Sequence, residues 1–218
     1  MIEDEKFDQI YPARIRKLSS LQWTPVRIAE QAARLLVTAP GARVLDIGRG
    51  AGKFCRVAAA LSEAHFTGIE QRADLVAAAR AAAETLRLSN VEIIHGNILD
   101  ISFANNDAFY LCNPFEENMF RGHRIDSAVP LSPELFERYI RHVAAQLGAR
   151  PLGTRVVTYS GYADEIPACY DCQRTFFHDD LKLWVKRREY DPVLDGLALG
   201  ASRSHRGTAG WVPPRRRA

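Results

Sequence analysis

The chain has 218 residues, of which 47% are apolar and 25% charged, and its formal net charge is +3. This length and composition are typical of a globular protein with one substantial α/β domain. No apolar run approaches the roughly 20 residues that a membrane-spanning helix needs, and four cysteines are too few for a disulfide framework in a chain of this size. The acidic start, residues 1–6, lacks the basic-then-apolar order of a secretory signal, so we expect a cytoplasmic protein.

The positive charge is concentrated toward the C-terminus. Residues 186–218 contain eight Lys or Arg and three Asp or Glu, a net charge of +5, so the rest of the chain carries −2. This slightly acidic body argues against a nucleic-acid partner, because nucleic-acid-binding surfaces are basic. We divide the chain into an N-terminal extension (1–22), one folded domain (23–190) and a basic tail (191–218) that we expect to be poorly ordered.

Taken in chain order, strand and helix patterns alternate. Trp23-Thr24-Pro25 predicts a helix start, with Thr24 as the N-cap and Pro25 in the first turn, and Ser132-Pro133 repeats this signal. Strands are expected at 44–47, 65–70, 91–95, 108–112, 154–160, 173–178 and 181–188, and helices at 26–37, 52–61, 72–88 and 133–148. Strands that alternate with helices predict a mainly parallel sheet, and the last two strands read as an antiparallel hairpin.

The most informative segment joins the first strand to the helix that follows it. Asp46 lies near the end of an apolar run, and Gly48, Gly50 and Gly52 follow at alternate positions. Glycines at such a turn let the backbone approach a ligand, and the helix N-terminus presents free N–H groups. Open α/β sheets bind nucleosides at this edge, and a second acid, Glu70, ends the next strand. These residues therefore predict a nucleoside site.

This pattern resembles that of the class I S-adenosylmethionine-dependent methyltransferases over residues 20–188. Members of that family carry an acid followed by G-x-G-x-G, and a second acid that holds the ribose hydroxyls. The resemblance implies a seven-stranded, doubly wound, mainly parallel Rossmann-like sheet with an antiparallel C-terminal hairpin, and S-adenosylmethionine as the methyl donor. The cofactor-binding residues that it implies are Thr24 near the methionine end, Asp46, Gly48, Gly50 and Gly52 in the turn, Glu70 at the ribose, and Asn97 near the adenine.

The same resemblance places the methyl acceptor beside Asn113, Pro114 and Phe115, at the end of the fourth strand. Asn113 Oδ1 and the Pro114 carbonyl offer acceptors for the hydrogens of a nitrogen nucleophile, and Phe115 offers a packing surface. Enzymes that methylate adenine or glutamine carry two prolines in this motif, whereas this chain carries one. The motif also resembles the Asn-centred fourth-strand motif, with aromatic residues, of the histone-lysine methyltransferases that lack a SET domain, and this resemblance implies an amine nitrogen of a protein or a small molecule. The alternative is a non-catalytic protein that keeps the fold as a binding or regulatory module.

Several residues allow more than one interpretation. A nicotinamide-binding turn would place its third glycine at position 53, which is Lys53, so that alternative is disfavoured. Asn97 suits a turn cap as well as an adenine contact. Arg49 stands between the first two glycines, where it would either pair with the methionine carboxylate or a neighbouring acid, or obstruct the pocket. Cys169 and Cys172 form a single C-x-x-C without a second ligand pair, so we expect no metal site.

Overall fold

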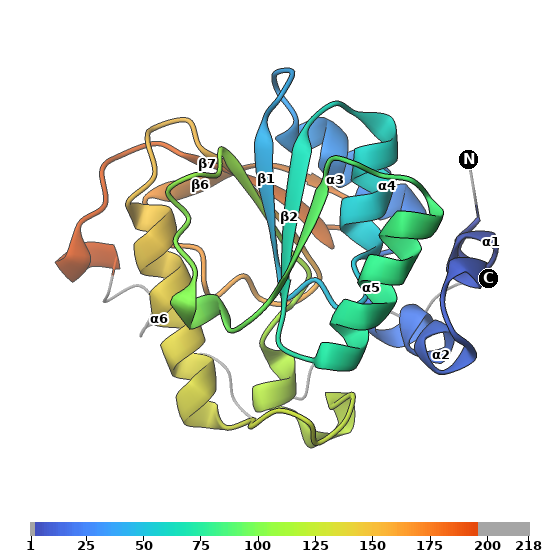
Figure 1. Cartoon of the computed structure of the whole chain (residues 1–218). Coiled ribbons are helices and arrows are strands. Elements are labelled where there is room, and N and C mark those ends of the chain that lie inside the picture. Colours follow the sequence, from blue (N-terminus) through green and yellow to red (C-terminus); the bar gives the residue numbers. More distant parts are fainter. Residues whose placement is uncertain (1–2, 196–218) are drawn as a thin grey trace.

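The computed structural model of the chain describes residues 3–195. At its centre is a seven-stranded sheet with the order β3-β2-β1-β4-β5-β7-β6 (Figure 1). The strands are β1 (Arg43–Ile47), β2 (His65–Glu70), β3 (Val91–His95), β4 (Ala108–Leu111), β5 (Arg155–Tyr159), β6 (Tyr170–Phe176) and β7 (Leu181–Lys186). Neighbours from β3 to β5 run parallel, whereas β7 is antiparallel to β5 and β6. The predicted doubly wound sheet with an antiparallel C-terminal hairpin is confirmed.

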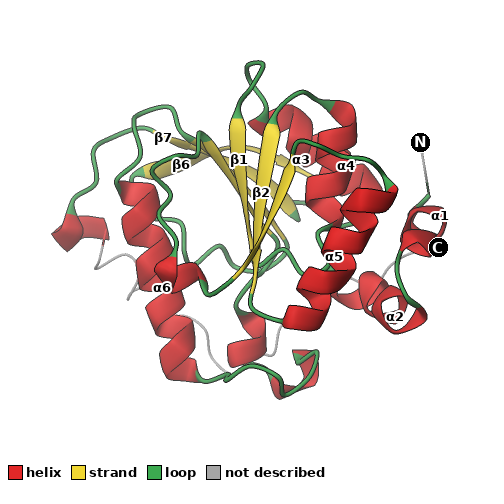
Figure 2. Ribbon diagram, viewed as in Figure 1, coloured by secondary structure: helices red, strands yellow, loops and turns green. Residues whose placement is uncertain are grey.

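Helices cover both faces of the sheet (Figure 2). The helices are α3 (Val26–Leu36), α4 (Lys53–Leu61) and α5 (Ala73–Thr85) on one side, and α6 (Pro133–Gly148) on the other. Under α4, Phe54 stacks on Tyr110 of β4 with ring centroids 3.8 Å apart. On the opposite face, Val143 and Leu147 of α6 pack in one buried cluster with Phe109 of β4. Successive residues of β4 thus fill two separate cores, as the alternation of side chains along a strand requires.

The N-terminal segment packs against the start of α4 and against α5. It forms α1 (Asp4–Phe7), a 3-10 turn η1 (Asp8–Ile10) and α2 (Ala13–Gln22). Lys53 Nζ is buried and lies 2.5 Å from Asp4 Oδ1 and 2.8 Å from Asp8 Oδ1. Two carboxylates therefore neutralise a buried ammonium, which would otherwise be costly to desolvate. Tyr11 and Trp23 add an apolar contact with Ala51 and with Leu75 of α5.

The two helix starts predicted from proline differ in detail. At α6 the prediction is confirmed, because Ser132 Oγ accepts the Leu135 N–H at 3.2 Å and Pro133 stands in the first turn. At α3 the N-cap is Pro25, and Thr24 makes no cap. The Thr24 hydroxyl instead shares a hydrogen bond of 2.7 Å with the Tyr110 hydroxyl. The N-cap prediction for Thr24 was wrong because this buried hydroxyl has a partner on β4.

The first five residues of the predicted tail are described, and they fold back on the domain. The Asp195 carboxylate is fully buried and accepts two hydrogen bonds of 2.9 Å from the Arg188 guanidinium. Residues 196–218, which include the Arg-rich end, lie outside the described residues. Within residues 3–195 no helix has the length and apolar character that crossing a membrane requires.

Candidate functional site

A cleft lies where β1 and β2 end, and the glycine turn after β1 forms part of its wall. Gly48 and Gly50 line this cleft with φ of +68° and +55°, values that residues with side chains rarely adopt. Space is restricted too, because a Cβ on Gly48 would lie 2.4 Å from Pro114 Cβ, and one on Gly50 would lie 2.7 Å from Trp23 Nε1. The two glycines therefore let Pro114 and Trp23 lie directly on the turn. Gly52, with φ +74°, instead caps α4 and is not among the residues that line the cleft.

Glu70 ends β2 and lines the same cleft, with an exposed fraction of 7%. Its Oε2 accepts the Gly50 N–H at 3.0 Å, and its Oε1 accepts the Arg72 N–H at 2.9 Å. Burial raises the pKa of this carboxyl, and the N–H of Arg72 opposes the rise. Each carboxylate oxygen has two lone-pair positions, so each can accept one further hydrogen bond. This geometry suits two neighbouring hydroxyl groups, such as those of a ribose.

Asp46 adjoins the turn but is not among the residues that line the cleft. Its carboxyl is 2% exposed, and Oδ2 accepts a hydrogen bond of 3.2 Å from the Cys55 thiol. Burial raises the pKa of Asp46 to about 7, although the thiol hydrogen bond acts in the opposite direction. Asp46 therefore supports the turn from within the protein.

Asn97 follows β3 and caps the short turn η2 (Ile98–Asp100). Its Oδ1 accepts the Leu99 N–H at 3.0 Å. The neighbours Gly96 and Ile98 line the cleft, whereas Asn97 is not among the lining residues. The structure thus shows the turn cap, and it is Gly96 and Ile98 that border the space predicted for the adenine.

Asn113, Pro114 and Phe115 follow β4, and the last two line the cleft. Asn113 has a φ of +45°, and its Nδ2 donates to Glu116 Oε2 at 2.5 Å. The same Glu116 oxygen lies 3.0 Å from His123 Nδ1. We call these three side chains the Asn113–Glu116–His123 cluster. Asn113 itself is not among the lining residues, and its Oδ1 faces Gly161, on which a Cβ would lie 2.7 Å away.

The sequence from 38 to 117 matches a family described as "Methyltransferase domain". This stretch of the chain is therefore similar to methyltransferase domains. The match covers the glycine turn, Glu70 and the segment after β4, so it includes both parts of the cleft described above. No curated protein matches the sequence.

Solved structures with similar folds include methyltransferases. An RNA methyltransferase from Salinibacter ruber in complex with S-adenosyl-L-homocysteine is 20% identical, with 79% of this chain and 98% of that chain covered and a TM-score of 0.57. TrmN from Thermus thermophilus is 18% identical, with 79% and 51% covered and a TM-score of 0.57. A point mutant of MtNAS in complex with S-adenosylmethionine is 16% identical, with 85% and 72% covered and a TM-score of 0.55. At these identities the likeness is one of fold.

Arg49, inside the glycine turn, is not among the residues that line the cleft. Its side chain is 5% exposed, and a Cβ on Gly52 would lie 2.6 Å from Nη2 and one on Gly68 2.3 Å from Cδ. None of its three side-chain nitrogens has a hydrogen-bond partner within residues 3–195. Burial lowers the pKa of this guanidinium. Arg49 therefore packs between the turn and β2, and it does not obstruct the cleft.

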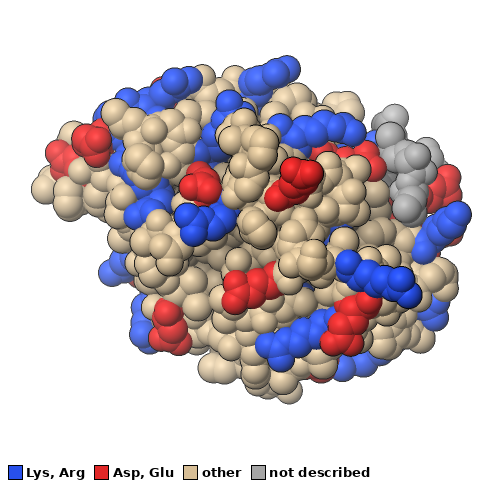
Figure 3. Space-filling model, turned by 45° about the horizontal axis from the view of Figure 1, so that its top comes forward, with Lys and Arg blue, Asp and Glu red and all other residues tan. Residues whose placement is uncertain are grey.

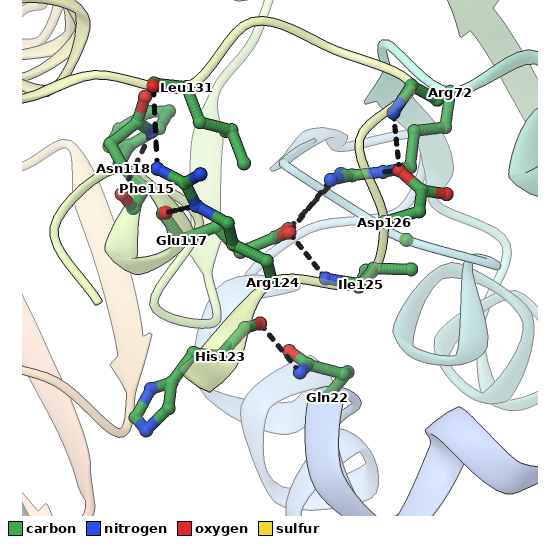
Figure 4. A network of polar contacts seen from close by, with 12 residues as sticks. Gln22, Arg72, Phe115, Glu117, Asn118, His123, Arg124, Ile125, Asp126 and Leu131 are labelled. Atoms are coloured by element: carbon green, nitrogen blue, oxygen red, sulfur yellow. Dashed lines mark hydrogen bonds and ion pairs between the residues drawn. The ribbon is translucent and has the colours of Figure 1, made fainter. Parts of the chain in front are cut away.

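Sequence reasoning missed the loop that borders the cleft. We call residues 115–131 the cleft loop, and its Glu117 and Ile125 line the cleft. Arg72 connects this loop to β2, with Nη2 2.7 Å from Glu117 Oε2 and Nε 2.9 Å from Asp126 Oδ1 (Figure 4). The Ile125 N–H also donates to Glu117 Oε2 at 2.8 Å. The mixture of acids and cations in this irregular segment was the only signal, and it does not indicate which pairs form.

The segment before α3 also contributes to the cleft, through Gln22 and Trp23. Gln22 Nε2 donates to the His123 carbonyl oxygen at 3.0 Å, which joins α2 to the cleft loop (Figure 4). Thr24 is 3% exposed and is not among the lining residues. The segment predicted to approach the methionine end of the cofactor thus borders the cleft through Trp23 and not through Thr24. Within residues 3–195 no group of three or more His, Cys, Asp or Glu side chains is placed to hold a metal ion.

Proposed function

We propose that this methyltransferase domain transfers a methyl group from S-adenosylmethionine to an amine nitrogen held beside Asn113 and Pro114. S-adenosylmethionine is the methyl donor of the family, and two of the similar structures hold this cofactor or S-adenosyl-L-homocysteine. The observation that carries the proposal is Glu70, whose carboxylate is held by two backbone N–H groups and still has a free accepting position on each oxygen. A ribose bound there would lie on the glycine turn.

The residues of the cleft supply proximity and alignment, because methyl transfer from a sulfonium is an in-line displacement. Pro114 lies against Gly48, so the wall formed after β4 adjoins the turn closely. Phe115 stacks on Tyr139 with ring centroids 5.0 Å apart, which holds the aromatic wall of the acceptor space. The acceptor nitrogen would be oriented by Asn113 Oδ1, since a hydrogen on the nitrogen can be donated to that atom.

The Asn113–Glu116–His123 cluster supports an acceptor that loses a proton. Methylation of an amine by a sulfonium leaves a cationic nitrogen, which returns to its neutral form by giving a proton to a base. Glu116 and His123 are side chains that can take up such a proton, and Glu116 contacts the Asn113 amide directly. Glu116 is 13% and His123 29% exposed at the side chain, so both stay within reach of solvent.

The surface charge supports a small molecule or a protein as acceptor. On the face shown in Figure 3, Lys and Arg are interspersed with Asp and Glu. Proteins that bind nucleic acid gather basic side chains on one face. One structure with a similar fold is an RNA methyltransferase, so RNA belongs among the acceptors that are tested.

The proposal is tested with S-adenosylmethionine that carries a radiolabelled methyl group. The purified protein is incubated with three acceptor pools: small amines, a protein extract and total RNA. We expect label in an amine or protein pool, and loss of that label in Asn113→Ala while affinity for S-adenosyl-L-homocysteine is kept. Asn105→Ala, an exposed asparagine before β4, is the matched control. Label in RNA alone would contradict the acceptor class, and normal turnover in Asn113→Ala would remove that residue from the site.

A further inference from the structure

The indole of Trp23 has an unusual place in the cleft wall. Trp23 follows α2 in an extended conformation, and its side chain is 7% exposed. Its Nε1 is buried and has no hydrogen-bond partner within residues 3–195. Indole N–H groups usually find an acceptor when they are buried. An unpaired donor costs roughly 1–3 kcal/mol, so its presence here requires a reason.

The position of the unpaired donor is defined by the glycine turn. A Cβ on Gly50 would lie 2.7 Å from Trp23 Nε1 and 3.0 Å from Cδ1, so the N–H edge of the indole lies on the turn. The Tyr11 ring packs on the indole with centroids 5.3 Å apart. Trp23 lines the cleft together with Gly48 and Gly50. A phenylalanine would keep an aromatic ring beside Tyr11 and the turn without burying a polar group, so the need for an apolar ring does not by itself account for the tryptophan.

Of the groups on S-adenosylmethionine, the α-carboxylate suits this donor best, an argument that rests on the proposed function. The ribose hydroxyls are assigned to Glu70, and the space bordered by Gly96 and Ile98 is assigned to the adenine. The remaining strong acceptor is the carboxylate of the methionine part. Among the other cleft side chains that could donate to it, Gln22 and Arg72 are already bonded to the cleft loop, Gln22 to His123 and Arg72 to Glu117 and Asp126. Gln71 also lines the cleft, but its amide contacts Asn97, beside the space assigned to the adenine.

We infer that Trp23 Nε1 is a hydrogen-bond donor for the methionine carboxylate of the bound cofactor. The glycine at position 50 then has two roles, because it provides the positive φ of the turn and the space that brings the indole N–H against it. A hydrogen bond to an ionised acceptor is about twice as strong as a neutral one. Trp23 thereby distinguishes adenosine compounds that carry the amino-acid part from those that lack it.

The test compares two ligands by calorimetry on wild type and Trp23→Phe. S-adenosyl-L-homocysteine carries the carboxylate, whereas 5′-methylthioadenosine shares the adenosine and sulfur but lacks the amino-acid part. In Trp23→Phe we expect the affinity for S-adenosyl-L-homocysteine to fall by about tenfold or more, and the affinity for 5′-methylthioadenosine to stay the same. Trp184→Phe is the matched control, because Trp184 Nε1 already donates to Thr158 Oγ1 at 2.9 Å.

The outcomes separate this inference from the proposed function. If wild type binds neither ligand, the proposed function fails. If wild type binds S-adenosyl-L-homocysteine and Trp23→Phe binds it equally well, or loses both ligands equally, the inference is overturned. Should Trp23→Phe not fold, the three indole N–H resonances of the wild-type protein give the answer, with the Trp184 and Trp211 signals assigned from Trp184→Phe and Trp211→Phe. The Trp23 signal should move downfield with S-adenosyl-L-homocysteine and not with 5′-methylthioadenosine, and equal movement with both overturns the inference.

Discussion

The glycine turn and the cleft loop border the same cleft but are held together in different ways. In the turn, the charged group of Glu70 is bound by backbone N–H groups of Gly50 and Arg72, at the ends of buried strands. The cleft loop is irregular, and it is held to β2 by ion pairs between side chains, from Arg72 to Glu117 and Asp126. Backbone contacts beside strand ends leave little freedom, whereas contacts made by a long side chain such as Arg72 can change with its rotamer. We therefore expect the turn side of the cleft to be preformed and the loop side to be more adjustable.

The largest expected effect is on the turn, from Glu70→Ala. We expect affinity for S-adenosyl-L-homocysteine to fall by about a thousandfold, because two hydrogen bonds to a charged group, worth roughly 2 kcal/mol each, are lost. Calorimetry measures the change, and circular dichroism checks the fold. Glu84→Ala, on the exposed side of α5, is the control and should bind normally. Near-normal affinity in Glu70→Ala would mean that the preformed side of the cleft does not hold the ribose.

The second effect concerns the pH dependence of stability, through Asp46. Its pKa is raised from an ordinary 3.8 to about 7, so the folded protein binds a proton in this range that the unfolded chain does not. The free energy of unfolding therefore falls as pH rises toward 7. Between about pH 5 and about pH 8, Asp46 should lower the free energy of unfolding of the wild type by on the order of 3 kcal/mol. This contribution should be absent in Asp46→Asn, and urea unfolding at several pH values measures it. Burial also raises the pKa of Glu165 to about 7, so its contribution to the fall in the free energy of unfolding should remain in the variant. An unchanged slope in Asp46→Asn would contradict the burial of a charged carboxylate at the turn.

A third prediction tests how tightly the turn packs against β2. A Cβ on Gly68 would lie 2.3 Å from Arg49 Cδ, so Gly68→Ala should lower the free energy of unfolding by about 2 kcal/mol. Arg49→Ala, which removes the clashing stem and an unpaired buried cation, should restore much of this loss in the double variant. Gly122→Ala in the cleft loop is the contrast, because a Cβ there meets nothing within 4 Å. Additive effects of Gly68→Ala and Arg49→Ala would show that the two residues do not interact.

The smallest effect is expected in the cleft loop, from Arg72→Ala. The variant keeps the backbone N–H that binds Glu70 but loses both ion pairs to the loop. We expect S-adenosyl-L-homocysteine to dissociate about fivefold faster, a cost of roughly 1 kcal/mol, in stopped-flow experiments. Arg14→Ala, which removes exposed ion pairs of 2.6 Å to Asp74 and 3.6 Å to Asp126, should change little. If Arg72→Ala weakened binding of S-adenosyl-L-homocysteine as much as Glu70→Ala, the proposed difference between the turn side and the loop side of the cleft would be contradicted.

The parts that the sequence predicted are those with local signals. The strand before the glycine turn, the strand that ends at Glu70 and the hairpin were all recognisable, because short apolar runs and turn residues mark them within a few positions. The cap at Ser132 was also recognisable, since a hydroxyl before a proline is a local pattern. The side of the cleft formed by the glycine turn and Glu70 consists of features with such local sequence signals.

The parts that the sequence did not reveal depend on distant partners. Lys53 is neutralised by Asp4 and Asp8, more than forty positions earlier, and Arg72 pairs with Glu117 and Asp126, separated from it by 45 and 54 positions. No spacing rule links such residues. Thr24 shows the same limit, because its hydrogen bond to Tyr110 depends on how α3 meets β4.

The most direct test of the account is a crystal structure of the protein with S-adenosyl-L-homocysteine. The account predicts that both ribose hydroxyls lie within hydrogen-bond distance of the Glu70 carboxylate, on the turn formed by Gly48 and Gly50, with the sulfur toward Pro114. A ligand bound elsewhere, or an empty cleft at a saturating concentration of the ligand, would contradict it.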